Sequence, residues 1–247
     1  MALRILETRP HTIVLASPHN LRLLGSISVV MTENSSGELK GHSGSSVSLR
    51  AKCDRQFAHE ILHESEVERL PVVGANFGTA EGRASNMQMD WGTLVPLWFL
   101  LANRKVKTRI VIVTPSREIS LLKNFRFGKL LGRLMQRDVR RRFVFVASAD
   151  QAHAHSKTGP YGFNKAAPEY DEVVLDAIRN NHLKRLLRLN PAFVERAKPD
   201  SLWQMVILAG ITETVPSHSE LLSYQVPTYY GMACAAFMPT ITNRRSV

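Results

Sequence analysis

A chain of 247 residues that is 44% hydrophobic is long enough to bury one sizeable core, and this composition argues against a chain that is disordered throughout. The formal net charge is +11, but the basic residues are dispersed and the densest run, RDVRRR, has no interleaved aromatics, so no nucleic-acid partner is expected. The longest apolar stretch, LVPLWFLLA, is about half of a membrane span, and neither a signal peptide nor a disulfide framework is indicated, so we expect a cytoplasmic protein without a membrane partner.

Apolar runs and helical periodicity alternate along the chain, whereas the polar, glycine-containing segment 33–46 is interpreted as a long loop. This alternation predicts an α/β fold with a central mixed, largely parallel sheet and helices on both faces, forming a single domain over residues 1–247. The predicted strands are 11–17, 27–32, 70–76, 108–116 and 143–149, and the predicted helices are 54–69, the apolar part of 89–104, 117–137, 169–187, 191–197 and 201–212.

Polar, turn-rich sequence follows four of the predicted strands, as SPHN, GANFGT, TPSRE and ASADQAHAH. If these strands are parallel, their carboxyl ends share one edge of the sheet, where ligands bind in α/β folds. His19, His153 and His155 are then candidates for metal binding or proton transfer at that edge. His153 and His155 are two residues apart, so in an extended segment only one of them can point into a site.

The segment HEILH, from His59 to His63, matches the H-E-x-x-H pattern of zinc proteases. The helical phase argues against a zinc site, because Phe57, Ala58 and Ile61 centre the buried stripe and both histidines lie off it. We therefore expect both histidines to face solvent.

Three further positions each allow a functional and a structural interpretation. Pro18 favours an extended Ser17, so the strand ends sharply and presents His19 either as a metal ligand or as a loop histidine bonded to nearby backbone. Asp90 is expected to cap the following helix. The turn GPYGF places the phenol of Tyr161 near the same edge, or is an ordinary surface turn.

Four stretches together resemble the catalytic-subunit-B family of class III extradiol ring-cleavage dioxygenases, including its Memo-like relatives. They occur in the family's order, as HTIVLASPHN, MDWGTLVPL, SADQAH with GPYGF, and SYQVPTYYGMACAAF. The resemblance implies an α/β domain that holds non-haem Fe(II) with two histidines and one carboxylate and cleaves the ring of a catechol- or aminophenol-type aromatic. It also implies a dimer, by analogy alone.

The resemblance assigns roles to individual residues. His19 matches a metal histidine, His153 matches a catalytic histidine that handles protons, and Asp150 matches the aspartate of the same motif. Tyr161 lies in the matching turn, and Tyr161, Trp91 and Thr93 are expected to contact the substrate.

The chain departs from the family's pattern at three places. The family's other metal histidine precedes the strand at 11–17, and no matching strand and loop are found here. Trp91 stands where the family has a catalytic histidine, and an indole cannot relay a proton. Pro199 stands about where the metal-binding glutamate belongs, with Asp200 beside it as the candidate carboxylate ligand.

Two explanations of these departures stay open. Either the chain is a shortened version of an active Fe(II) dioxygenase for a small aromatic substrate, or it is a non-catalytic paralogue or Memo-like binding subunit. In the second case it would act as a homodimer or as a heteromer with an active homologue. Three independent departures favour impaired or lost activity, and the family-level function is extradiol-dioxygenase-like.

Overall fold

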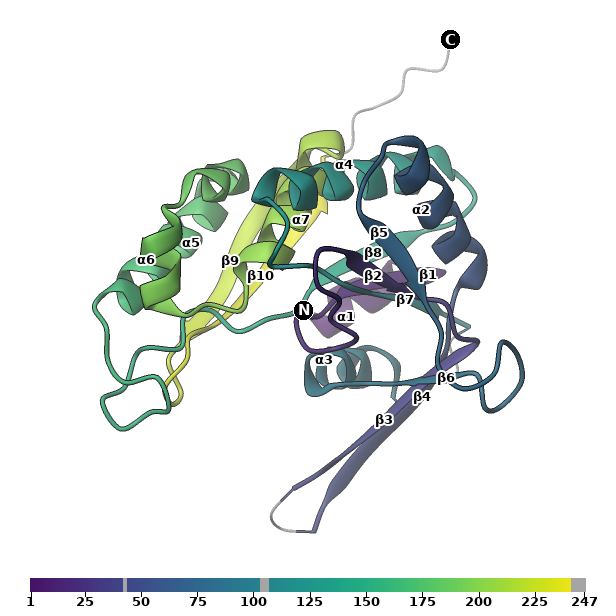
Figure 1. Ribbon diagram of the computed structural model, residues 1–247, viewed down its shortest axis with the longest axis horizontal. Coiled ribbons are helices and arrows are strands. Elements are labelled where there is room, and N and C mark those ends of the chain that lie inside the picture. The colour runs from purple at the N-terminus through teal and green to yellow at the C-terminus, as the bar shows by residue number, and fades with distance from the viewer. Residues whose placement is uncertain (42–43, 103–106, 241–247) are drawn as a thin grey trace.

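The computed structural model describes residues 1–41, 44–102 and 107–240, and a five-stranded sheet forms its centre. Strands β7–β1, β1–β8 and β2–β5 pair in parallel, whereas β2 and β7 pair antiparallel, so the predicted mixed, largely parallel sheet is confirmed. In the order β5-β2-β7-β1-β8 the strands are Val72–Ala75, Ile27–Val30, Arg109–Thr114, Thr12–Ala16 and Phe143–Ala147 (Figure 1).

The direction of the strands decides which loops meet. Ala16 pairs with both Val113 and Ala147, so β1, β7 and β8 end level with one another at one edge of the sheet. Strands β2 and β5 run the other way, because the short link 17–26 returns the chain antiparallel to β7. The segment GANFGT therefore leaves the opposite edge, and the prediction that all four polar strand ends share one edge is wrong for this segment.

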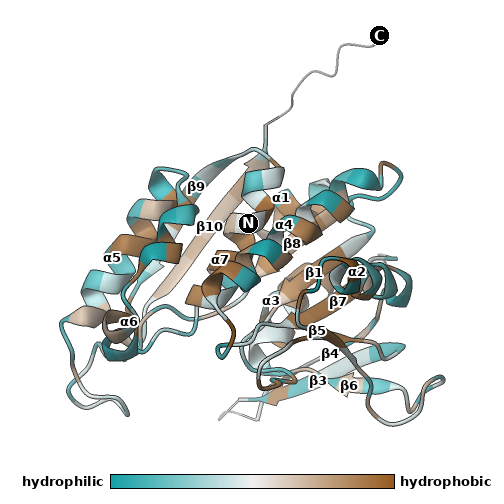
Figure 2. Cartoon of the chain, turned by 45° about the horizontal axis from the view of Figure 1, so that its top comes forward, coloured by the Kyte–Doolittle hydropathy of each residue, from teal (hydrophilic) through white to brown (hydrophobic). Residues whose placement is uncertain are grey.

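Successive residues of the central strands point to opposite faces of the sheet, and both faces are covered. Val14 and Ala16 pack toward α2 (Arg55–Val67), α4 (Leu121–Arg137) and α7 (Leu202–Thr214). On the other face, Ile13 and Leu15 pack toward α3 (Trp91–Leu101) and toward a small second sheet, near the short α1 (Ala2–Glu7). Figure 2 shows hydrophobic residues along β1, β7 and α7, as expected for strands buried on both faces.

The small second sheet corrects the predicted loop over 33–46. Strands β3 (Asn34–Lys40) and β4 (Ser46–Lys52) pair antiparallel, and β6 (Asn86–Gln88) adds to β3 in parallel. The hairpin projects from the body of the molecule (Figure 1). Its residues are polar because one face is exposed, and cross-strand backbone bonds rather than apolar burial define these strands.

A third group of elements completes the fold. The hairpin of β9 (Ser217–Gln225) and β10 (Met232–Pro239) lies between α7 and α5 (Ala166–Arg179) (Figures 1 and 2). The predicted helix 169–187 is two pieces, α5 and the 3₁₀ helix η1 (Leu183–Arg188), because the chain turns at Asn181, whose φ is 52°. Helix α6 (Pro191–Ala197) follows, as predicted. Among the described residues, no helix has the length and apolar character needed to cross a bilayer.

Candidate functional site

The carboxylate of Asp200 joins the loops that follow β1 and β7. His19 Nε2, from the loop after β1, lies 3.1 Å from Asp200 Oδ2. Arg117 Nη2, from the loop after β7, lies 2.5 Å from Asp200 Oδ1. The loop after β8 reaches the same place, because Ala152 forms a β-bridge with Pro199. The carboxyl ends of the three parallel strands therefore converge on the link between α6 and α7.

Asp200 is ionised at neutral pH. Burial opposes ionisation of this side chain, which is 15% exposed, but the hydrogen bond from His19 and the charge of Arg117 outweigh it and hold the pKa at about 2. The guanidinium of Arg117 also stacks 4.6 Å from the ring of Trp203, which fixes its position beside the carboxylate. Asp200 therefore carries a negative charge that a protein cation already partly neutralises.

His153, from the loop that follows β8, contacts the same link between α6 and α7. Its Nδ1 is 2.8 Å from the carbonyl oxygen of Lys198, which can only accept, so Nδ1 carries a proton. Its Nε2 is 3.5 Å from Asp150 Oδ2. Burial favours the neutral ring, but the bonds to Asp150 and the Lys198 carbonyl and the charge of Asp200 raise the pKa of His153 above its usual value. This histidine is therefore suited to hold and release a proton at the edge of the sheet.

Aromatic rings surround His153. The centroids of Tyr161, Tyr229 and Tyr230 lie 5.7, 5.9 and 5.9 Å from the imidazole centroid. Tyr161 is 56% exposed, so one side of this ring cluster is open to a ligand. Tyr229 and Tyr230 come from the turn between β9 and β10, which sequence reasoning matched to the family without giving these residues a role.

His155 turns away from this cluster, as the two-residue spacing predicted. Its Nε2 lies 2.8 Å from Asp171 Oδ2, and Asp171 also accepts hydrogen bonds from Tyr224 Oη at 2.6 Å and from the Ala152 amide at 2.8 Å. Burial dominates at Asp171 and raises the pKa of this carboxyl. Asp171 thus holds the chain on both sides of His153.

Sequence reasoning missed Asp171, although a signal was present. It falls on the apolar stripe of α5, between Tyr170 and Val174, and it is 1% exposed. A carboxylate on the buried face of an amphipathic helix needs partners, and that requirement marks it as a support residue.

Asp90 holds the loop that carries His19. Its Oδ2 accepts a 2.5 Å bond from Ser17 Oγ, and its Oδ1 accepts bonds from Asn20 Nδ2 at 3.3 Å and from the hydroxyl of Thr93. Asp90 occupies the N-cap position of α3, as predicted, but within the described part of the chain its side chain makes no capping bond to a backbone amide. The side chains of Ser17, Asn20 and Thr93 occupy both carboxylate oxygens of Asp90. The carboxylate therefore fixes the loop that carries His19 and does not bind the backbone amides of the helix.

The two predicted substrate contacts on α3 differ in accessibility. Trp91 is 56% exposed, and its ring lies 4.5 Å from the His19 ring, so it faces the same edge of the sheet. Thr93 is 0% exposed and its hydroxyl is used by Asp90. Contact of either residue with a substrate stays a prediction, and the burial of Thr93 argues against it.

The donor set at this edge fits Fe(II) only in part. His19 and Asp200 supply one imidazole and one carboxylate, whereas the facial arrangement for non-haem iron takes two imidazoles and one carboxylate. Among the residues that the structure describes, no group of three or more His, Cys, Asp or Glu side chains is placed to hold a metal. His59 and His63 of the HEILH segment are exposed, as predicted.

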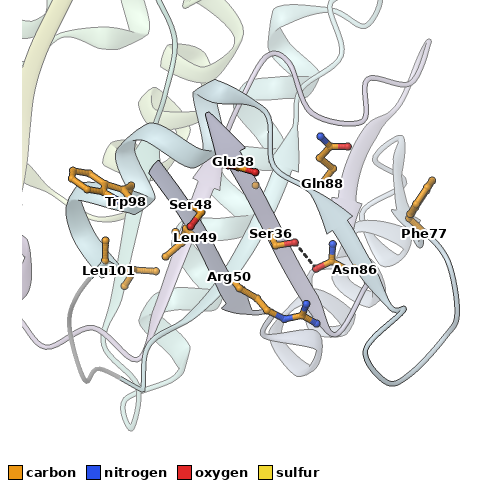
Figure 3. A pocket seen from close by; sticks show the side chains of 12 residues that line it. Ser36, Glu38, Ser48, Leu49, Arg50, Phe77, Asn86, Gln88, Trp98 and Leu101 are labelled. Atoms are coloured by element: carbon orange, nitrogen blue, oxygen red, sulfur yellow. Dashed lines mark hydrogen bonds between the residues drawn. The ribbon is translucent and has the colours of Figure 1, made fainter. Parts of the chain in front are cut away.

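A cavity of about 670 Å³ lies away from these residues, over the small second sheet. Figure 3 shows Trp98 and Leu101 at one end of it and Phe77 at the other, with the 3.0 Å hydrogen bond between Ser36 and Asn86 in the middle. None of its lining residues is a predicted site residue, so this cavity does not change the candidate site.

Comparison with known proteins relates the chain to one family. The family model for the catalytic LigB subunit of aromatic ring-opening dioxygenase matches residues 1–238. Protein CA_C1420 of Clostridium acetobutylicum is 24% identical over 216 residues, which are 87% of this chain and 46% of that protein, so the chain spans about half of that relative's length. The crystal structure of the uncharacterized protein JW3007 from Escherichia coli K12 matches with a TM-score of 0.62 at 15% identity, covering 93% of this chain and 86% of that one, which shows a shared fold.

Proposed function

The chain belongs to the LigB family of aromatic ring-opening dioxygenase catalytic subunits, and on that premise we propose that the edge formed by His19, Asp200 and His153 is an extradiol-type site. Its ligand is a catechol- or aminophenol-type aromatic. The observation that carries this proposal is the 3.1 Å approach of His19 Nε2 to Asp200 Oδ2, with His153 on the same link.

The residues of this edge have distinct parts in the proposal. His19 and Asp200 are two of the three donors for non-haem Fe(II), which when bound supplies electron transfer between an aromatic diolate and dioxygen. His153 holds a proton near the ligand, and Asp150 stabilises its protonated form. Tyr161 and the indole of Trp91 offer exposed rings against which an aromatic can pack. A third metal donor would have to come from beyond this group of residues.

A second candidate function is favoured by Arg117 and Trp91. Arg117 places a cation on Asp200, and Trp91 covers one side of His19, so both remaining donors already have protein partners. In this alternative the domain is a non-catalytic paralogue or Memo-like binding subunit that pairs with an active homologue. It binds the aromatic without turning it over.

Anaerobic loading with Fe(II) separates the two candidates. The purified chain is mixed with ferrous iron and desalted, and the iron retained per chain is measured. Catechol and 2-aminophenol are then added with air, and the absorbance of a ring-opened product is followed. His19→Ala tests the donor pair, and His59→Ala is the matched control because His59 is an exposed histidine far from the pair in sequence. Arg117→Gln removes the competing cation.

The outcomes are distinct. Retention of about one iron per chain that His19→Ala abolishes and His59→Ala preserves, together with turnover, supports the extradiol enzyme. Aromatic binding without iron, with iron retained only after Arg117→Gln, supports the non-catalytic candidate. Absence of both iron uptake and aromatic binding contradicts both proposals.

A further inference from the structure

We propose that the opposite edge of the central sheet carries a second site, a cationic cavity that binds a small phosphate-bearing anion. This site is independent of the extradiol-type site. Thr12 and Arg109 are the first residues of β1 and β7 and pair with each other, and both line the cavity. The His19 and Asp200 group lies past the other ends of the same strands, so the two sites are separated by the length of the sheet.

The cavity has the size and lining of a small-molecule site. Its volume is about 540 Å³, within the range of roughly 300–1,000 Å³ that such sites occupy. Five basic side chains line it, against two acidic ones. The cavity lining therefore carries an excess of positive charge.

The acidic side chains of the cavity already have partners. Asp54 accepts bonds from Thr12 Oγ1 at 2.5 Å, from the Phe57 amide at 3.1 Å and from Arg141 at 3.3 Å. The carboxylate of Glu33 lies 3.9 Å from Arg55. Asp54 therefore caps α2 and neutralises Arg141. Arg55 lies 3.8 Å from Glu81 as well as 3.9 Å from Glu33, so among the described residues the unmatched cations of the cavity are Lys52, Lys107 and Arg109.

Three cations remain for a ligand, together with one guanidinium nitrogen of Arg55. Among the described residues, Lys52 and Lys107 have no side-chain hydrogen bond or ion pair, and Arg109 makes only a long 3.5 Å bond to the Cys53 carbonyl. The Nε of Arg55 is buried and has no acceptor within the described part of the chain. A buried guanidinium donor without a partner is costly, and a ligand oxygen would satisfy it. Phosphate offers several such oxygens together with the matching charge.

Cys53 limits the chemistry of this cavity to binding. Burial raises the pKa of its thiol to about 11, so it is neutral at physiological pH and is neither a nucleophile nor a ready metal ligand. The hydroxyl of Thr12 and the amide of Gln56 already donate to Asp54 and Glu60, so the remaining side-chain donors are guanidinium, ammonium and imidazole groups. His11 Nδ1 accepts from the Arg142 amide at 2.9 Å, which leaves Nε2 as the donor of the neutral ring.

Calorimetric titration tests the site on the whole chain. Inorganic phosphate, pyrophosphate and ATP are titrated at low and at physiological salt, with acetate as a monoanion that lacks the phosphate geometry. The Lys52→Gln and Arg109→Gln double variant removes two exposed cavity cations that make no ion pair with any described residue. Lys123→Gln with Arg188→Gln is the matched control, because it lowers the net charge equally on exposed helical positions elsewhere.

We expect the wild-type chain to bind pyrophosphate or ATP more tightly than acetate. Losing two charge-assisted contacts should weaken that affinity roughly tenfold or more in the cavity variant, and less than about twofold in the control. The phosphate-bearing probe that binds most tightly identifies the preferred form of the anion. Equal losses in both variants would show attraction to the net charge alone. That result, or a wild-type chain that binds none of the three phosphates, overturns the proposal.

Discussion

Replacing Gly231 with alanine should destabilise the domain through Asp171. A Cβ atom at position 231 would lie 2.0 Å from Asp171 Oδ2 and 3.0 Å from its Cγ, far inside van der Waals contact. Asp171 cannot rotate into solvent, because it is 1% exposed and is held by Tyr224, His155 and the Ala152 amide. The carboxylate must move by roughly 1 Å, and its bonds must break or lengthen.

The size of the effect follows from those bonds. The Oδ2 atom that would be displaced accepts from Tyr224 Oη at 2.6 Å and from His155 Nε2 at 2.8 Å. A displacement of roughly 1 Å takes both distances outside the range of a good hydrogen bond. Bonds to a charged group contribute about 1.5–3 kcal/mol each, so losing both should lower the free energy of unfolding of Gly231→Ala by about 3–6 kcal/mol.

Urea unfolding followed by tryptophan fluorescence measures this loss, and a double-mutant cycle isolates its cause. In the Asp171→Ala background the obstacle is gone, so adding Gly231→Ala should cost less than about 1 kcal/mol. An equal cost in both backgrounds would refute the assignment of the strain to Asp171. A cost below about 1 kcal/mol in the wild-type background would show that position 231 accepts a side chain without strain.

Three further predictions concern single residues. Asp200 has a pKa of about 2 in the folded chain against 3.8 for the free group, so its ionised form stabilises the metal-free fold by about 2 kcal/mol above pH 4. This contribution is lost as the pH falls through 2. The difference in the free energy of unfolding between the wild type and Asp200→Asn, measured in urea, should therefore fall by about half between pH 6 and pH 3. A Cβ on Gly92 would lie 2.7 Å from Ser17 Oγ, so Gly92→Ala should cost about 1–3 kcal/mol in thermal or urea unfolding and weaken aromatic binding. Buried Cys53, whose pKa is about 11, should resist Ellman's reagent in the folded chain while Cys234 reacts, and urea should expose both thiols.

The parts of the fold that the sequence predicted well are those whose signal is local. Strands β1, β7 and β8 are short apolar runs, which predict strands. β1 and β7 are buried as expected, whereas β8, at the edge of the sheet, is only half-buried. The opposite directions of His153 and His155 follow from the two-residue repeat of an extended chain. The exposure of His59 follows from the phase of α2.

The parts that were missed depend on partners distant in the sequence. The strands β3 and β4 are polar and have no clear alternation, so only their pairing with each other and with β6 reveals them. The antiparallel direction of β2 against β7 leaves no mark in residue periodicity, and for that reason the segment GANFGT was assigned to the wrong edge. The ion pair between Arg117 and Asp200 joins residues 83 positions apart, and neither residue alone suggests it.

The loops of the candidate site are held by residues other than those that would meet a metal or substrate. Asp90 fixes the loop of His19 through Ser17 and Asn20. Asp171 holds the segment around His153 through bonds made by its neighbours.

Neither carboxylate is bonded to the side chain at position 91, where the resemblance predicts a histidine and this chain has Trp91. A catalytic residue can therefore be replaced in such a site while its loops keep their positions. This separation would let the chain keep His19, His153 and Asp200 together across three loops even where its ligand set departs from the family's pattern. It also means that the fold of the family, taken alone, is weak evidence for ring cleavage, and that the donors themselves must be tested.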